Sequence, residues 1–297
     1  MQAPKVLLVS GTGLLGSTVA AVFRRAGVAI RATARVGELP VDLERVLAPQ
    51  LDSVMECERF THAVLCAAVA DPESCFRDPD RSRRVNQDAV AELVDLCRTW
   101  NVRPVFVSTD LVFSGNEDLC AETDPVAPGT AYGRQKAAAE RSVLRGGEGA
   151  AVIRVGKLMS QTLHPRSSLT PIIRACAGGE EYRAFRDQYV APVFAEDAAR
   201  ALLTVVQRGM RGVYHVAGDQ CFSRADLARA VCRGLGLGES GIREIRLEEF
   251  GFSEPRGRFN TLSAAKFKAE TGFRFTSLEE GLQNLRRSKE FRDMVGP

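Results

Sequence analysis

A glycine-rich turn after the first apolar run limits the fold of this chain more than any other feature. Residues 6–16 read VLLVSGTGLLG, so a short strand-like run leads directly into three closely spaced glycines. Such glycines permit a tight bend, close approach of a phosphate to the backbone, and close packing of the next helix on the strand. The free amide groups at the start of that helix bind a pyrophosphate. The turn therefore predicts a dinucleotide site, and the residues expected to form it are Gly11, Thr12, Gly13, Leu14, Leu15 and Gly16.

The first half of the chain alternates apolar runs with helical patterns. Strands are expected over residues 5–10, 29–34, 62–67, 104–108 and 151–155, and helices over 15–25, 86–100 and 131–144. This alternation is typical of a parallel sheet that helices cover on both faces. Crossovers of this length form right-handed strand–helix–strand units. We therefore expect an α/β fold, a Rossmann-type doubly wound parallel sheet.

After residue 155 the alternation weakens. Residues 160–188 are rich in Arg, Gly and Pro and are expected to be irregular. Further elements are expected as a helix over 196–207, a strand over 212–217, and helices over 223–235 (with Ser223 as its N-cap), 263–271 and 277–287. These patterns predict an NAD(P)-binding domain over 1–155 plus about 188–219. A smaller α/β substrate-binding lobe is expected over about 156–187 and 220–297.

Composition excludes several classes of function. The 297 residues are 45% hydrophobic, enough for a proper core, and 40 basic against 37 acidic residues leave a net charge of only +3. That balance gives no case for a nucleic-acid partner or an anionic membrane, and no apolar run reaches the roughly 18 residues of a membrane span. The eight cysteines show neither a C-x-x-C pair nor a metal-type spacing, so we expect no metal site and a reducing, cytoplasmic location.

The end of the second strand indicates which dinucleotide is bound. An acidic residue there bonds to the ribose of NAD(H), whereas an arginine favours the 2′-phosphate of NADP(H). Residues 30–35 read IRATAR, without a carboxylate. We therefore expect NADP(H) to be preferred over NAD(H), with Arg35 as the phosphate partner; the alternative is that Arg35 only solvates a loop. Asp42, after another short apolar piece, is expected to contact adenine.

A second motif points to the reacting end of the site. Tyr132 and Lys136 lie four residues apart on a helical segment, so both side chains share one helix face. Residues 106–113 read FVSTDLVF, an apolar strand that ends in polar residues at the edge where α/β sheets bind ligands. Thr109 or Ser108 is expected to hydrogen-bond a substrate carbonyl, and Tyr132 to supply a proton. Lys136 is expected to lower the tyrosine pKa from about 10 and to hold the ribose. The alternative is an amphipathic helix with an exposed pair.

These motifs resemble those of the extended short-chain dehydrogenases/reductases. Within that group the chain is most similar to the dTDP-4-dehydrorhamnose reductases and their sugar-nucleotide-binding relatives. Residues 108–113 (STDLVF) match the family block STDYVF, and 122–125 (ETDP) match the approach to its catalytic tyrosine. Residues 187–192 (DQYVAP) resemble DQxGxP, and 212–215 (GVYH) match GxYH. The resemblance covers nearly the whole chain.

The resemblance implies catalysis by Thr109, Tyr132 and Lys136, with hydride from a nicotinamide reducing a sugar 4-ketone. Ala67 and Ala68, after the third strand, are assigned to the cofactor as well. The positions assigned to a nucleotide-sugar substrate are Ser108, Asp110, Leu111, Gln188 and Arg256.

The chain also departs from the family at several positions. The family turn is GxxGxxG, whereas here the first glycine is Ser10; Gly11 beside it is expected to compensate. Leu111 replaces the family tyrosine, and the family Arg-Pro reads Arg256-Gly257. Sugar-nucleotide dehydratases carry a glutamate where Leu111 stands, which argues against dehydration.

Two other functions remain open. An epimerase with tightly bound NAD(P) needs only the cofactor and the tyrosine–lysine pair. A non-catalytic regulatory protein of the same fold, as in the regulatory subunit of methionine adenosyltransferase, is the third hypothesis. A homodimer is compatible with all three. His215, in an apolar strand, is expected to be a packed core residue.

Overall fold

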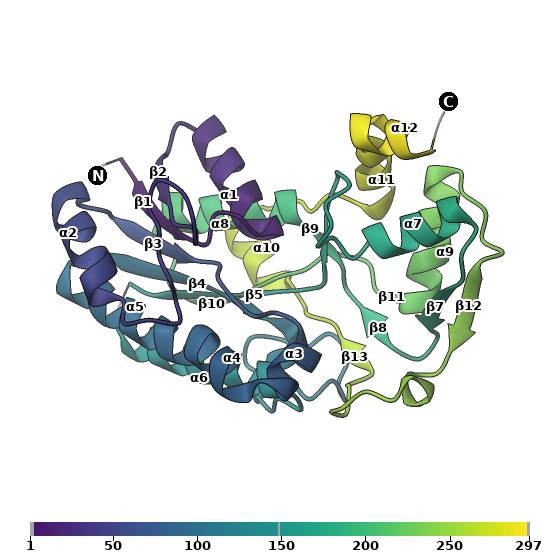
Figure 1. Ribbon diagram of the computed structural model, residues 1–297, viewed down its shortest axis with the longest axis horizontal. Helices are drawn as coiled ribbons and strands as arrows, with labels where there is room; N and C mark the ends of the chain where they lie inside the picture. Colours follow the sequence, from purple (N-terminus) through teal and green to yellow (C-terminus); the bar gives the residue numbers. More distant parts are fainter. Residues whose placement is uncertain (1–2, 148, 296–297) are drawn as a thin grey trace.

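Six parallel strands form the central sheet of the computed structural model, which describes residues 3–147 and 149–295 (Figure 1). From edge to edge their order is β2, β1, β3, β4, β5 and β10. The strands are β1 (Lys5–Val9), β2 (Ala29–Ala32), β3 (His62–Leu65), β4 (Arg103–Thr109), β5 (Ala151–Val155) and β10 (Gly212–Val216). Every strand expected for the central sheet is therefore present within a few residues of its predicted bounds.

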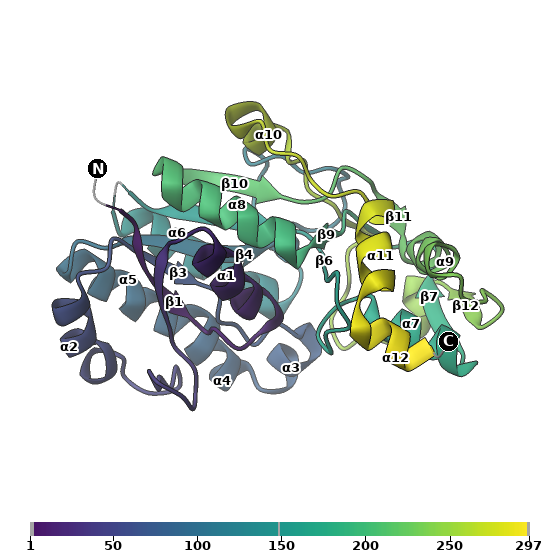
Figure 2. The same cartoon turned by 90° about the horizontal axis from the view of Figure 1, so that it is seen from above.

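Side chains alternate between the two faces of the sheet, and each face has its own helices. In β1, Val6 and Leu8 enter one core, whereas Leu7 and Val9 enter the other. The first core is covered by α1 (Leu14–Arg25) and α8 (Ala195–Arg208), and the second by α2 (Ala48–Glu58), α5 (Ala89–Thr99) and α6 (Ala131–Arg145). Figure 2 shows α1 and α8 lying over the sheet, with α5 and α6 behind it. The predicted doubly wound α/β fold is confirmed.

The chain reverses its direction of travel across the sheet between β1 and β3. From β1 it moves outward to β2, and it then returns to place β3 on the other side of β1. After β2 the chain forms an isolated parallel bridge between Ala34 and Pro40 and then continues into α2. Because of this reversal, the chain leaves the carboxyl ends of β1 and β3 in opposite directions. The divergence leaves a ligand-binding crevice at that edge of the sheet.

A smaller unit lies beyond the carboxyl ends of the strands (Figure 1). Its helices are α7 (Thr170–Gly178), α9 (Arg224–Leu235), α11 (Leu278–Arg287) and α12 (Lys289–Val295), and its strands include β7 (Tyr182–Phe185) and β12 (Ile242–Ile245). Ile173, Val231 and Leu282 are buried in its core. Residues 160–188, expected to be irregular, thus contain both α7 and β7. Ser223 caps α9 as expected, because its Oγ accepts a hydrogen bond from the amide of Asp226 (3.0 Å).

The segment around α10 (Ala265–Thr271) packs on the nucleotide-binding side, although the sequence patterns predict it in the lobe. Phe267 and Phe275 are buried in the same core as α1 and α8, and Lys266 Nζ donates to the carbonyl of Val213 in β10 (2.8 Å). Both views show α10 beside β10 (Figures 1 and 2). Helical periodicity predicts the helix but not its position, because the position depends on apolar contacts with residues far along the chain. No helix in the described part of the chain has the length and apolar character of a membrane span.

His215 is buried in β10 as a neutral side chain. Its Nδ1 lies 3.1 Å from the carbonyl of Cys120, to which it donates, and its Nε2 lies 3.3 Å from Arg154 Nη1, from which it accepts. Burial lowers the pKa of His215 to about 3, and the Arg154 charge acts in the same direction. The expected structural role of this histidine agrees with these contacts.

The buried histidine predicts a loss of stability in acid. Between about pH 6.5 and pH 3 the unfolded chain binds a proton at residue 215 that the folded chain does not, so stability falls as pH decreases through that range. From pH 7 to pH 5 the loss from this group is about 2 kcal/mol. Urea unfolding at both pH values, for the wild type and for His215→Gln, measures it. The variant should lose about 2 kcal/mol less on acidification; an equal loss in both proteins contradicts a neutral buried His215.

Candidate active site

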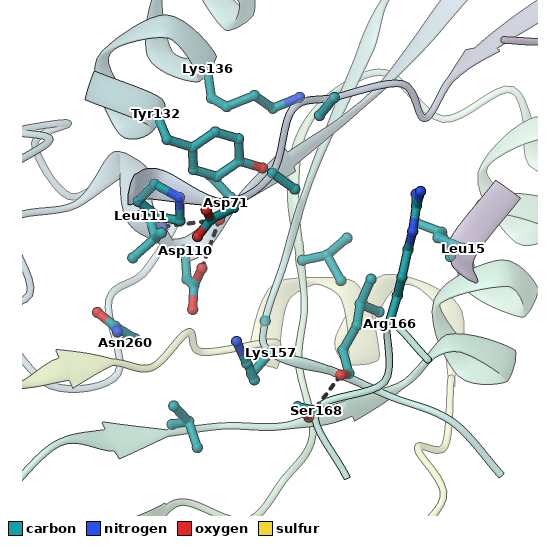
Figure 3. A pocket seen from close by; sticks show the side chains of 18 of the residues that line it. Leu15, Asp71, Asp110, Leu111, Tyr132, Lys136, Lys157, Arg166, Ser168 and Asn260 are labelled. Atoms are coloured by element: carbon teal, nitrogen blue, oxygen red, sulfur yellow. Dashed lines mark hydrogen bonds between the residues drawn. The ribbon is translucent and has the colours of Figure 1, made fainter. Parts of the chain in front are cut away.

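One cavity of about 520 Å³ lies at the carboxyl ends of β1, β3, β4 and β5. It brings together most of the residues that the sequence assigns to the site: Gly13, Leu14, Leu15, Gly16, Ala68, Ser108, Thr109, Asp110, Leu111, Tyr132, Lys136, Gln188 and Arg256. Figure 3 shows Tyr132 and Lys136 from α6 above Asp110, with Lys157 and Arg166 across the cavity. Gly11, Thr12, Ala67, Arg35 and Asp42 do not line it.

Ser10 itself adopts the left-handed backbone conformation at the start of the glycine turn. Its φ is +71°, the region that favours glycine, which is the residue the family has at this position. Gly11 does not take over this conformation, because its own φ is not positive. Gly11 instead permits close approach of β2: a Cβ on it would lie 2.7 Å from the Cβ of Ala32.

Gly16 lets α1 pack directly on the turn. A Cβ at residue 16 would lie 1.9 Å from the carbonyl oxygen of Ser10, a backbone atom that has no freedom to move aside. The N-cap residue of α1, Gly13, provides no side-chain hydrogen bond to the first turn of the helix. The amide groups of that turn therefore face the cavity without a side-chain cap, an arrangement that fits a pyrophosphate.

Arg35 and Asp42 line a second hollow, of about 410 Å³, beyond the end of β2. The Arg35 guanidinium is 2.8 Å from Glu44 Oε1, and its side chain is 69% exposed. The Asp42 carboxylate accepts from the amide of Glu44 (3.0 Å) and lies 3.4 Å from Arg45 Nε. Arg45 lines the same hollow, so this surface carries two arginines. The sequence motif predicts only Arg35 as a phosphate partner.

At the end of β4 two neighbouring hydroxyl groups are in different states. The Thr109 hydroxyl donates to Asp110 Oδ1 (2.7 Å) and accepts from the amide of Leu111 (3.2 Å). The Ser108 Oγ is buried and has no hydrogen-bond partner in the described part of the chain. A buried hydroxyl without a partner is costly, and since Ser108 lines the cavity, its Oγ is free to bond to a ligand.

The Tyr132 phenol is buried at the same strand end. Burial raises its pKa above the usual range, the Asp110 charge raises it further, and the Thr109 side chain acts in the opposite direction. The expectation that Lys136 lowers this pKa is not met: the pKa of Tyr132 is raised, and burial is the largest cause. A raised pKa keeps the phenol protonated at neutral pH, as a proton donor requires.

Lys136 lies one helical turn after Tyr132 and is only 2% exposed. Its Nζ donates to the carbonyl of Val107 (2.7 Å) and lies 3.8 Å from the centre of the Phe106 ring. Burial lowers the pKa of Lys136 to about 7, while the Glu140 charge opposes that shift. The side chain is thus held against β4, where it lines the cavity.

The N-terminal half of α6 lies close to the end of β4 and to the loop after β3. Gly133 lies against the turn after the strand: a Cβ on it would be 2.2 Å from the carbonyl of Leu111. The buried Asn86, in a π-helical turn before α5, donates to Gln135 of α6 (2.8 Å). The same Asn86 amide accepts from the amide of Val69 (2.8 Å). The loop after β3 and the helix carrying Tyr132 are therefore tied to one side chain.

The other two substrate positions lie at the far wall of the cavity. Gln188 is buried and donates to the carbonyl of Gly257 (3.1 Å). Arg256 forms an ion pair with Glu73 through Nη2, while its buried Nη1 has no partner in the described part of the chain. An anchored guanidinium with a free N–H group fits an anionic ligand.

Three basic residues that line the cavity were not identified from the sequence motifs: Lys157, Arg166 and Arg224. Lys157 follows β5 by two residues, so the rule that ligands bind at strand ends could have found it. The neighbouring Arg224 charge, with burial, lowers the pKa of Lys157 to about 8. Arg166 and Arg224 come from the lobe, where no local motif marks them.

Comparisons with known proteins identify a family and several relatives. A family model described as RmlD substrate binding domain matches residues 4–290. A probable low-salt glycan biosynthesis reductase from Haloferax volcanii is 26% identical over 291 residues, covering 94% of this chain and 96% of that protein. A dTDP-4-dehydrorhamnose reductase from Mycobacterium tuberculosis is 30% identical over 208 residues, covering 68% of each. The structure of dTDP-4-dehydrorhamnose reductase from Bacillus anthracis in complex with NADP has a TM-score of 0.87 at 20% identity, covering 96% of this chain and 99% of that one.

Proposed function

Because this chain belongs to the RmlD substrate-binding family, we propose that it is an NADPH-dependent reductase of a keto group on a nucleotide-activated deoxysugar. The observation that carries the proposal is the single cavity shared by an uncapped glycine turn, a strand end with a free hydroxyl, and the Tyr132–Lys136 pair. The two curated relatives from Haloferax volcanii and Mycobacterium tuberculosis are named reductases, which supports the same reaction class.

In this proposal the cavity residues have separate roles in binding the cofactor, donating the proton and orienting the keto group. The amide groups of Gly13 and the first turn of α1 would hold the pyrophosphate of the dinucleotide. NADPH, when bound, supplies the hydride for the keto carbon. The Tyr132 phenol donates its proton to the carbonyl oxygen, and Thr109 and Ser108 orient that oxygen. Lys136, one helical turn after Tyr132 and beside it in the cavity, would hold the ribose through its Nζ.

The test of this proposal is an assay of NADPH absorbance with a panel of nucleotide-activated keto sugars and small ketones. A reductase consumes NADPH in proportion to the product formed. An epimerase with bound NAD(P) would convert substrate with no net loss of absorbance. If no compound is reduced while the protein alters the activity of a partner enzyme, the reductase proposal is wrong and the regulatory alternative holds.

Cofactor preference gives a separate prediction at Arg35. Replacing Arg35 by alanine removes a guanidinium from the hollow beyond β2, so affinity for NADPH should fall about 10-fold relative to NADH. Dissociation constants of both cofactors, measured by titration, give this ratio. Arg31→Ala is the matched control, since Arg31 lies within β2 and pairs with Glu58 instead. An unchanged ratio in Arg35→Ala would refute the phosphate role.

A further inference from the structure

Arg166 reaches from the lobe to the glycine turn. Its Nη1 lies 3.6 Å from the position that a Cβ would take on Gly13, and Arg166 lines the cavity together with the start of α1. Figure 3 shows its guanidinium directed toward Leu15. The reaction proposed above gives this arginine no role.

The backbone that carries Arg166 is fixed by its own hydrogen bonds. The amide of Arg166 donates to His164 Nδ1 (3.1 Å). The buried Ser167 accepts from the amide of Ser160 through its Oγ (3.0 Å), and the Ser168 hydroxyl donates to the carbonyl of Leu158 (2.8 Å). The exposed side chain of Arg166 therefore projects from a turn whose backbone is tied on both sides.

The charge of Arg166 is not neutralised within the protein. In the part of the chain that the structure describes, no carboxylate forms an ion pair with Arg166. Opposite it stands the first turn of α1, a helix of 12 residues whose amide groups have no side-chain cap. Positive groups thus face one another from two sides of the same space, which suits a ligand with two negative charges.

We propose that Arg166 is a further cofactor-binding residue, which holds the pyrophosphate of the dinucleotide against the glycine turn. This inference rests on the proposed function, because that function places a pyrophosphate at Gly13. The planar guanidinium bonds to two phosphate oxygens at once. Since Arg166 belongs to the lobe and Gly13 to the sheet domain, the cofactor then joins the two units.

The test compares ligands that contain a pyrophosphate with one that does not. Dissociation constants are measured by calorimetry for NADPH, NADH, ADP-ribose and adenosine 2′-phosphate with the full chain. Arg166→Ala should weaken NADPH, NADH and ADP-ribose by the same factor, about 10-fold, and leave adenosine 2′-phosphate unchanged. Arg166→Lys, which retains the charge, should recover part of the affinity. Arg174→Ala is the matched control, because Arg174 is exposed on α7 and does not line the cavity.

Each other outcome has a definite meaning. Unchanged affinity of Arg166→Ala for ADP-ribose overturns the inference and leaves the proposed function intact. A nucleoside diphosphate sugar is titrated in the same way. If Arg166→Ala weakens its binding and leaves ADP-ribose unaffected, Arg166 belongs to the substrate site and the inference is also overturned. If the wild type binds none of the dinucleotides, the proposed function fails and the inference fails with it.

Discussion

Replacing Tyr132 by phenylalanine is expected to lower turnover about 100- to 10,000-fold, the usual contribution of a general acid. The substitution removes one hydroxyl from a buried ring at the end of β4 and leaves the ring volume almost unchanged. The pKa of Tyr132 is raised by burial, so the phenol is protonated throughout the neutral range and is available as a donor. Single-turnover NADPH oxidation with the best substrate of the panel measures the loss, and NADPH titration should show an affinity near that of the wild type.

The matched control is Tyr182→Phe, in β7 of the lobe, which lies outside the cavity. It should retain the wild-type rate. A Tyr132→Phe enzyme that keeps more than about one tenth of its turnover would assign the proton to another donor. A fall in NADPH affinity that accounts for the whole effect would make Tyr132 a binding residue only.

The sequence predicts the sheet and its glycine turn well because both depend on local patterns. The run at residues 6–16 contains its own strand, bend and helix start. Glycine is required at position 16 because a Cβ there would collide with the nearby backbone of Ser10, so the requirement does not depend on distant residues. The same holds for α6, where Tyr132 and Lys136 share a helix face by spacing alone. The inner strands β1, β3, β4 and β5 follow from short apolar runs, since they are buried on both faces. The edge strand β2 is only partly buried.

The features that the sequence does not predict depend on contacts between distant segments. Glu254 accepts from the amide of Ala131 at 2.9 Å, so the N-terminus of α6 is held by a residue 123 positions later. Arg166 approaches Gly13 across a similar separation. The direction of the Tyr132 pKa shift is not predictable from the sequence for the same reason. This pKa depends on how deeply the fold buries the side chain, whereas the spacing to Lys136 indicates only a neighbouring charge.

The position of α6 also depends on a buried ion pair behind the site. Glu140, one turn after Lys136, accepts from Arg154 of β5 at Nε (3.0 Å) and Nη2 (2.8 Å), and both side chains are 4% exposed. The remaining N–H of Arg154 faces His215 in β10. The helix of Tyr132 and Lys136 is thus connected through one guanidinium to two strands of the sheet.

Replacing Glu140 by alanine is therefore expected to lower the free energy of unfolding by about 3–5 kcal/mol, because the buried charge of Arg154 loses its partner. Urea unfolding at pH 7 measures the change. The control is Asp95→Ala, which breaks an exposed pair with Arg98 (side chains 68% and 70% exposed) and should cost less than about 1 kcal/mol. The double variant Glu140→Ala with Arg154→Met should recover much of the loss, since it leaves no unpaired charge. If the double variant is no more stable than Glu140→Ala, packing and not charge holds α6 against the sheet.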